Sequence, residues 1–195
     1  MEMKSVDLIS DLIERTRNIL NQAEELRPLS DEELNWKPQP ESWSILECLE
    51  HLNRYGDFYL AEIDRRMSQS ALPASLYFKS GWLGNYFAQA MLPKEKLNKM
   101  KTFKSMNPLG SRLDKEVLTT FIDQQKIMLK LLTKARNHNL TKVKTGITLT
   151  AMIKLRLGDT FRVVIYHNQR HLEQVQRLVE GMPGDLICKK SFVQT

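Results

Sequence analysis

The sequence predicts an all-α protein folded as a four-helix bundle, and three observations support this class. Apolar residues recur at helical spacing in four long segments. The chain has only 8 glycines and 7 prolines, which disfavours a β fold with many turns. Its 195 residues, of which 42% are hydrophobic and 27% charged, suit one globular core. We therefore expect a single domain over residues 1–195, built on four long helices.

The first two expected helices flank a proline-containing connection. The first helix spans Ser5 to Leu26 and carries an apolar stripe along its length. Residues 29–42 contain two prolines and are interpreted as a connection. The second helix begins at Ser42 or Ser44, because a glutamate follows Ser44 by three residues, as in a capping box.

An irregular, aromatic-rich insertion separates the second helix from the third. It covers residues 71–109, and we expect a short helix from about Tyr77 to Met91 inside it. The third long helix spans Ser111 to Asn137. The fourth spans Thr150 to Glu180 and ends at a Gly-Met-Pro-Gly stop signal.

The aromatic side chains of the insertion allow several interpretations. Phe78, Trp82, Tyr86 and Phe87 lie within eighteen residues that carry a single lysine. We favour a cover over one end of the bundle. A dimer contact or a wall of the substrate pocket comes next, and attachment to a membrane comes last because so little positive charge accompanies the aromatic rings.

Cysteine usage and hydropathy favour the cytoplasm. Cys48 and Cys188 form neither a CxxC pair nor a disulfide framework, which is typical of a reducing compartment. Acidic residues interrupt the apolar residues near the N-terminus, so we expect no secretory signal. No apolar run approaches the roughly 20 residues that a membrane span needs.

The net charge of +6 raises the question of nucleic-acid binding. Five lysines cluster in the insertion, namely Lys94, Lys96, Lys99, Lys101 and Lys104. Lysine-rich connections are usually just solvated. We therefore expect a small-molecule partner, and neither nucleic acid nor a membrane.

The most informative residues are two histidines in the fourth helix. His167 and His171 are four residues apart, so both project from one helix face. That face also carries Ile153, Val164 and Leu178, whereas Arg162 falls on the opposite side. Buried imidazoles need either hydrogen-bond partners or a metal ion. The pair alone leaves both interpretations open.

A third histidine shifts the balance towards a metal site. His51 lies in the second helix at the margin of its apolar stripe. Helical bundles build metal sites by directing side chains from facing helices at one point. Three imidazoles would leave coordination positions open, as in catalytic sites. The fourth histidine, His138, follows the third helix and is expected to be exposed.

The segment HNQRH is not the HExxH motif of zinc proteases. Asn168 stands where the general-base glutamate would be, so peptidase chemistry of that type is not expected.

Two motifs in order resemble the DinB/YfiT-like superfamily. The string ESWSILECLEHL, from Glu41 to Leu52, resembles its Trp-Ser-x-x-Glu helix start followed by a first histidine. The string HNQRHLEQVQRL, from His167 to Leu178, resembles its H-x-x-x-H-x-x-Q helix. The resemblance covers nearly the whole chain. It implies a four-helix bundle with a three-histidine metal site, usually zinc or nickel, and often a homodimer.

The resemblance also implies an enzymatic function. Activities in this superfamily include transfer of low-molecular-weight thiols such as bacillithiol or mycothiol, and a thiol-dependent isomerisation. It implies His51, His167 and His171 as ligands, with supporting roles open to Glu47 and Gln174 at matching motif positions. The long insertion is less typical of the superfamily, which limits inference of the substrate by analogy.

A divalent ion on three neutral imidazoles can activate water for hydrolysis or a thiol for transfer. We consider Glu47, one turn before His51, as a group that orients His51 or accepts a proton, and equally as an ordinary N-terminal helix residue. Tyr55, one turn after His51, is a candidate hydrogen-bond donor to the substrate, with simple packing as the alternative. Cys48 lies in the apolar stripe and is not expected to be a nucleophile. The alternative function is a non-catalytic metal-binding bundle.

Overall fold

The computed structural model describes residues 1–93, 102–148 and 150–184. These residues form a mostly helical fold with two small sheets. In chain order the elements are β1 (Glu2–Lys4), α1 (Ser5–Glu24), α2 (Asp31–Asn35), α3 (Ile45–Ser68), β2 (Tyr77–Lys79), α4 (Trp82–Met91), the 3₁₀ turn η1 (Lys104–Met106), α5 (Glu116–Ala135), β3 (Lys144–Ile147), β4 (Thr150–Arg156) and α6 (Leu157–Glu180). The lysine cluster from Lys94 to Lys101 lies outside the described residues.

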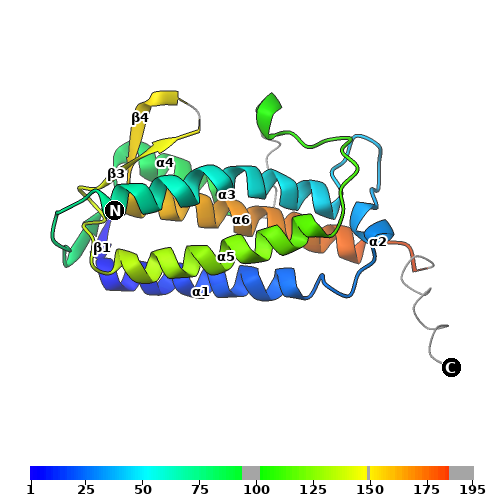
Figure 1. Ribbon diagram of the computed structural model, residues 1–195, viewed down its shortest axis with the longest axis horizontal. Helices are drawn as coiled ribbons and strands as arrows, with labels where there is room; N and C mark the ends of the chain where they lie inside the picture. The colour runs from blue at the N-terminus through cyan, green and yellow to red at the C-terminus, as the bar shows by residue number, and fades with distance from the viewer. Residues whose placement is uncertain (94–101, 149, 185–195) are drawn as a thin grey trace.

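Long helices supply the core. Helices α1, α3, α5 and α6 lie side by side, with α4 and the β3–β4 hairpin at one end and α2 at the other (Figure 1). Both α1 and α3 pack against α5 and α6. Each long helix turns an apolar stripe inward, and Leu12, Ile45, Phe121 and Ile165 are each at most 1% exposed. This packing fixes the relative positions of α3 and α6.

Helix α3 begins as its sequence predicts. The side chain of Ser44 accepts a hydrogen bond from the backbone N–H of Glu47, and the Glu47 carboxylate accepts one from the backbone N–H of Ser44. This capping box satisfies donors that would otherwise lack partners at the helix start. Ser30 and Glu33 form a second capping box at α2, so the segment interpreted as a connection contains a short helix.

The prediction of one helix from Thr150 to Glu180 is wrong in its first part. Residues Thr150–Arg156 form strand β4, which pairs antiparallel with β3, and α6 begins only at Leu157. The strand pairs Thr145 with Leu155, and both side chains are buried. Cross-strand pairing therefore overrides helical spacing in this short mixed segment. Ile153 lies on the strand and not on the histidine face of the helix.

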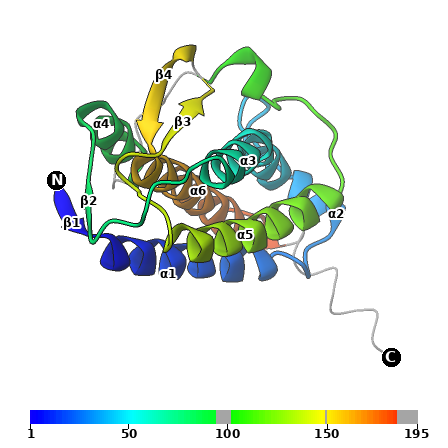
Figure 2. The same cartoon turned by 60° about the vertical axis from the view of Figure 1, so that its left-hand side comes forward.

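The aromatic insertion divides into a strand and a helix. Strand β2 pairs with β1, and α4 follows and packs against α6, so the expected helix begins at Trp82 and not at Tyr77 (Figure 2). Phe78 is fully buried against Gly158, whose missing side chain leaves room for the ring. Trp82 and Tyr86 are 84% and 62% exposed, so these two rings do not cover the core.

No helix among the described residues is long and apolar enough to cross a membrane.

Candidate metal centre

Helix packing brings three histidines together. His167 and His171 project from one face of α6, and α3 packs against that helix and adds His51. One nitrogen from each ring lies within 4.8 Å of the others. The Nε2 atoms of His51 and His167 are 3.3 Å apart. The structure thus joins the three residues that the sequence singles out.

The donor set fits a transition-metal ion, and the distance between two of its three nitrogens does too, although the full set spans up to 4.8 Å and would have to draw closer around an ion. Imidazole nitrogens bind zinc at roughly 2.0–2.1 Å, which places two ligands of a tetrahedral site about 3.4 Å apart. The observed 3.3 Å between the Nε2 atoms of His51 and His167 agrees with this spacing. Neutral imidazoles suit zinc, nickel, copper and iron alike, so the ligands alone do not select the metal.

The far nitrogens of two rings are held by oxygen acceptors. Nδ1 of His51 lies 2.6 Å from the backbone carbonyl oxygen of Met106, and Nδ1 of His171 lies 3.2 Å from Oε1 of Gln174. A carbonyl oxygen only accepts hydrogen bonds, so Nδ1 donates in each case. The Nε2 lone pairs of His51 and His171 are therefore available to a cation, an arrangement that metal-binding histidines commonly show.

The surroundings keep the imidazoles neutral. His51 is only 3% exposed, and burial, opposed by the Met106 carbonyl, lowers its pKa below the ordinary value. Burial is also the main cause that lowers the pKa of His171 to about 3, with the neighbouring His51 adding to the effect. Burial and then the charges of His171 and His51 hold the pKa of His167 well below its usual range. Neutral rings are the form that binds metal.

Two aromatic side chains border the cluster. The Trp43 ring lies 4.8 Å from the ring of His51 and 5.8 Å from that of His171, measured between centroids. The Tyr55 ring lies 5.0 Å from the rings of both His51 and His167. Both aromatic residues are half-buried. They therefore pack directly beside the imidazoles while part of each ring stays accessible to solvent.

Glu47 lies one turn before His51, and both of its carboxylate oxygens accept hydrogen bonds. Its carboxylate is completely buried and accepts hydrogen bonds from Lys37 Nζ at 2.7 Å and from the backbone N–H groups of Ser44 and Gly110 at 2.9 Å and 2.6 Å. These contacts give the carboxylate a structural task at the start of α3. They supply partners for a buried charge that would otherwise be costly.

Comparison with known proteins identifies the family of the chain. The sequence model of the DinB superfamily matches residues 12–175. The chain belongs to the DinB superfamily. The matched range includes α3, α5 and all three histidines. No curated protein and no solved structure shows significant similarity to the chain.

Sequence reasoning missed two parts of this DinB-superfamily site. The sequence could have indicated Trp43, because this residue is the first of the Trp-Ser-x-x-Glu motif at the start of α3. It could not have indicated the Met106 carbonyl, since a backbone acceptor is independent of residue type. The expected exposure of His138 is also wrong: it is half-buried, and its ring nitrogens lie 3.0 Å and 3.1 Å from the carbonyls of Lys134 and Met67.

Cys48 agrees with its expected inert role in this DinB-superfamily chain. It is fully buried, and burial raises the pKa of its thiol far above the ordinary value. A thiol that stays protonated is a poor nucleophile.

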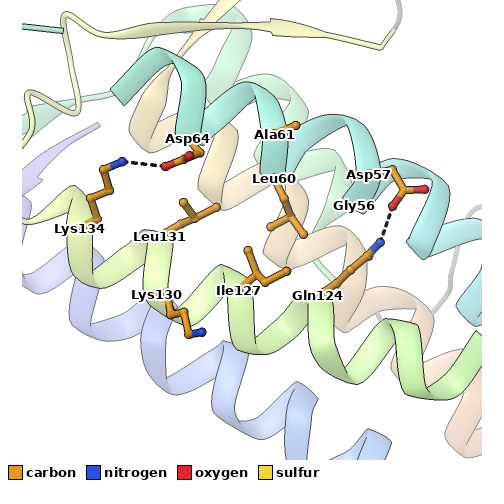
Figure 3. A pocket seen from close by; sticks show the side chains of 10 residues that line it. All are labelled: Gly56, Asp57, Leu60, Ala61, Asp64, Gln124, Ile127, Lys130, Leu131 and Lys134. Carbon is orange, nitrogen blue, oxygen red and sulfur yellow. Dashed lines mark hydrogen bonds and ion pairs between the residues drawn. The ribbon is translucent and has the colours of Figure 1, made fainter. Parts of the chain in front are cut away.

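An open groove of about 520 Å³ runs between α3 and α5, and none of the three histidines lines it (Figure 3). Two polar contacts bridge its sides, from Lys134 to Asp64 at 2.7 Å and from Gln124 to Asp57 at 2.9 Å. Gly56 permits the close approach of Gln124, because a Cβ there would lie 1.9 Å from Oε1 of that side chain. The groove thus follows the line where α3 and α5 pack together, and it is separate from the histidine site.

Proposed function

We propose that this DinB-superfamily chain, as a four-helix bundle, holds one divalent transition-metal ion, zinc or nickel, and catalyses thiol transfer or a related hydrolysis on a small molecule. One observation carries the proposal: three neutral imidazoles from α3 and α6 converge with their ligand nitrogens within 4.8 Å. Catalytic zinc sites usually have three protein ligands, whereas structural zinc sites usually have four.

The ligand set determines the chemistry that the ion would supply. A divalent ion with three neutral ligands keeps its positive charge and lowers the pKa of a water molecule or thiol that reaches it. His51, His167 and His171 would hold the ion. Deprotonated thiols are the reactive form in attack on an electrophile, which is the step that thiol transfer needs.

The remaining residues divide into substrate contacts and support. Trp43 and Tyr55 border the imidazoles and would contact the substrate, with the Tyr55 hydroxyl as a hydrogen-bond donor. Burial raises the pKa of Tyr55, so its hydroxyl stays protonated at neutral pH. Glu47 would support the site without transferring protons, because Lys37 and two backbone N–H groups already occupy its oxygens.

The decisive experiment measures metal content in protein purified without a metal-affinity column or chelator. We expect about one equivalent of zinc or nickel per chain in the parent, and less than about a tenth in His167→Ala, because two imidazoles bind such ions far more weakly than three. His138→Ala is the matched control, since that imidazole contacts carbonyls outside the cluster. Equal metal content in all three proteins contradicts the site.

A turnover screen then separates the enzyme from its alternative. Metal-loaded protein is tested with low-molecular-weight thiols plus electrophiles, and separately with hydrolysable esters and amides. Turnover that disappears in His167→Ala supports the enzyme. Bound metal with no turnover across the panel supports a non-catalytic metal-binding protein.

A further inference from the structure

Residues 103–110, here called the strap, lie over the N-terminal half of α3 (Figure 1). Four polar contacts besides that of His51 fasten the strap to α3 and to the residues just before it. They are Arg54 Nη1 to the carbonyls of Ser105 and Asn107 at 3.2 Å and 3.5 Å, Trp43 Nε1 to Asn107 Oδ1 at 3.2 Å, and the Gly110 N–H to Glu47 Oε1 at 2.6 Å. Arg54 is itself oriented by Glu50 at 2.8 Å.

The firmest of these anchors joins Glu47 to Gly110. The carboxylate is completely buried, and its contact with the Gly110 N–H is the shortest of the four. A hydrogen bond to an ionised acceptor is stronger than one between neutral groups. Gly110 has φ +81°, a left-handed conformation that residues with a side chain rarely adopt. Glycine at this position therefore lets the chain continue from the anchored N–H along its observed path.

The strap reaches the metal centre through one carbonyl oxygen. Met106 O lies 2.6 Å from Nδ1 of His51 and can only accept a hydrogen bond. Neutral imidazole carries one N–H, so a proton on Nδ1 leaves Nε2 bare. Nε2 is the atom of His51 that faces His167. Without the acceptor, the proton is free to occupy either nitrogen, and the Nε2–H form cannot bind a cation through that atom.

We propose that the strap is a positioning element that fixes His51 with its proton on Nδ1 before a metal ion arrives, and that Glu47 and Gly110 are its anchors. The effect on metal binding rests on the proposed function, whereas the effect on the proton position does not. His171 is an internal control, because its acceptor Gln174 lies three residues further along the same helix and does not depend on the strap.

The test compares Gly110→Ala with Gly184→Ala. A Cβ at either position has no atom within 4 Å, but only Gly110 has a positive φ. The first substitution therefore displaces the strap by backbone strain alone, and the second adds the same methyl group without strain. Glu47→Gln is the second variant: it keeps the side-chain volume but replaces one of the two accepting oxygens with an amide N–H₂.

The first readout is long-range ¹H–¹⁵N NMR of the imidazole nitrogens in metal-free protein above pH 7. We expect His51 in the Nδ1–H form in the parent and in Gly184→Ala, and a mixture of both forms in Gly110→Ala and Glu47→Gln. His171 should keep its proton on Nδ1 in all four proteins. The second readout is zinc affinity by chelator competition, expected to fall 10- to 100-fold in the two strap variants only.

The outcomes separate the two ideas. An unchanged proton position on His51 in both strap variants overturns the strap proposal, even if metal affinity falls. A changed proton position in protein that binds no metal in any form supports the strap and rejects the proposed metal function. If Gly110→Ala does not fold, as circular dichroism would reveal, Glu47→Gln decides.

Discussion

Helix α6 carries two polar clusters of opposite character. Near its start, Asp159 and Arg162 are 0% and 1% exposed and lie 3.1 Å apart. Near its middle, His167 and His171 meet His51 of α3. Both clusters have a short helical spacing, three residues in one and four in the other. Spacing along a helix therefore does not by itself distinguish a structural pair from a ligand site.

The difference lies in how each cluster satisfies its own groups. The Asp159 carboxylate accepts hydrogen bonds from Ser80, the Gly81 N–H at 2.7 Å and Arg162, and Arg162 also donates to Asn85 at 3.1 Å. Opposite charges meet there, and within this cluster only Nε of Arg162 is a buried polar atom with no hydrogen-bond partner among the described residues. The histidine cluster holds no opposite charge, and the Nε2 lone pairs of His51 and His171 remain available because carbonyl oxygens accept from their Nδ1 atoms. The charged cluster is therefore complete within the protein, whereas the histidine cluster can still accept a cation.

The largest effect should come from breaking the charged cluster. Asp159→Ala leaves the Arg162 guanidinium buried without its carboxylate, and we expect a loss of about 3–5 kcal/mol in the free energy of unfolding. In metal-free protein, His171→Leu should change that free energy by no more than about 1 kcal/mol, because it replaces a buried polar ring with an apolar side chain. Urea unfolding at pH 7.5 measures both. Equal losses would erase the distinction between the two clusters.

A smaller effect should come from crowding the charged cluster without removing a charge. A Cβ on Gly84 would lie 2.5 Å from side-chain atoms of Asp159, so Gly84→Ala must push α4 away from α6. We expect a loss of about 1–3 kcal/mol in the free energy of unfolding, the usual cost of overpacking. Gly184→Ala, which meets no atom within 4 Å, should have no such effect. Comparable unfolding midpoints for the two variants would show that α4 can shift away from α6 at little cost in free energy.

The smallest effect at neutral pH, which grows as the pH falls, should be the pH dependence of the unfolding free energy that the histidines cause in metal-free protein. The pKa of His171 is about 3 when folded and about 6.5 when unfolded, so its contribution is complete above pH 6.5 and is lost as the pH falls towards 3. Within that window it removes up to about 1.4 kcal/mol of stability per pH unit. Burial opposes ionisation of Glu62, but hydrogen bonds that its carboxylate accepts from the Gly146 N–H, Arg66 and Arg65 together outweigh burial and lower its pKa to about 2. Protonation of Glu62 therefore affects stability only below about pH 4.5.

Urea unfolding between pH 7.5 and 5.0 therefore isolates the histidines. The slope of unfolding free energy against pH should be shallower in His171→Leu than in the parent. Identical slopes would mean that the ring is not held neutral in the folded protein.

Local signals in the sequence predicted the parts of the fold that local chemistry determines. Ser44 and the glutamate three residues later define the start of α3, and the glycine after Glu180 ends α6 as expected. The three histidines could be identified from the sequence because imidazole is a metal ligand in any fold, and because residues four apart on a helix always share a face. The superfamily assignment from the two motifs is confirmed by the match over residues 12–175.

Tertiary contacts account for what the sequence did not predict. Arg162 was assigned to the outer side of its helix, but it is 1% exposed, because α4 covers a second face of α6. A helical wheel assumes one covered face, and a short helix from a distant insertion breaks that assumption. Strand β4 was missed for a similar reason, since its partner β3 lies outside the periodic segment.

The division of the three histidines between α3 and α6 has a consequence for biosynthesis. A ribosome makes the chain from the N-terminus, so His51 leaves the ribosome long before His167 and His171 have been translated. The helix that carries His167 and His171 also packs against α1, α3 and α4. An ion that needs all three imidazoles can therefore bind only after residue 171 has been translated and α6 has packed against α3.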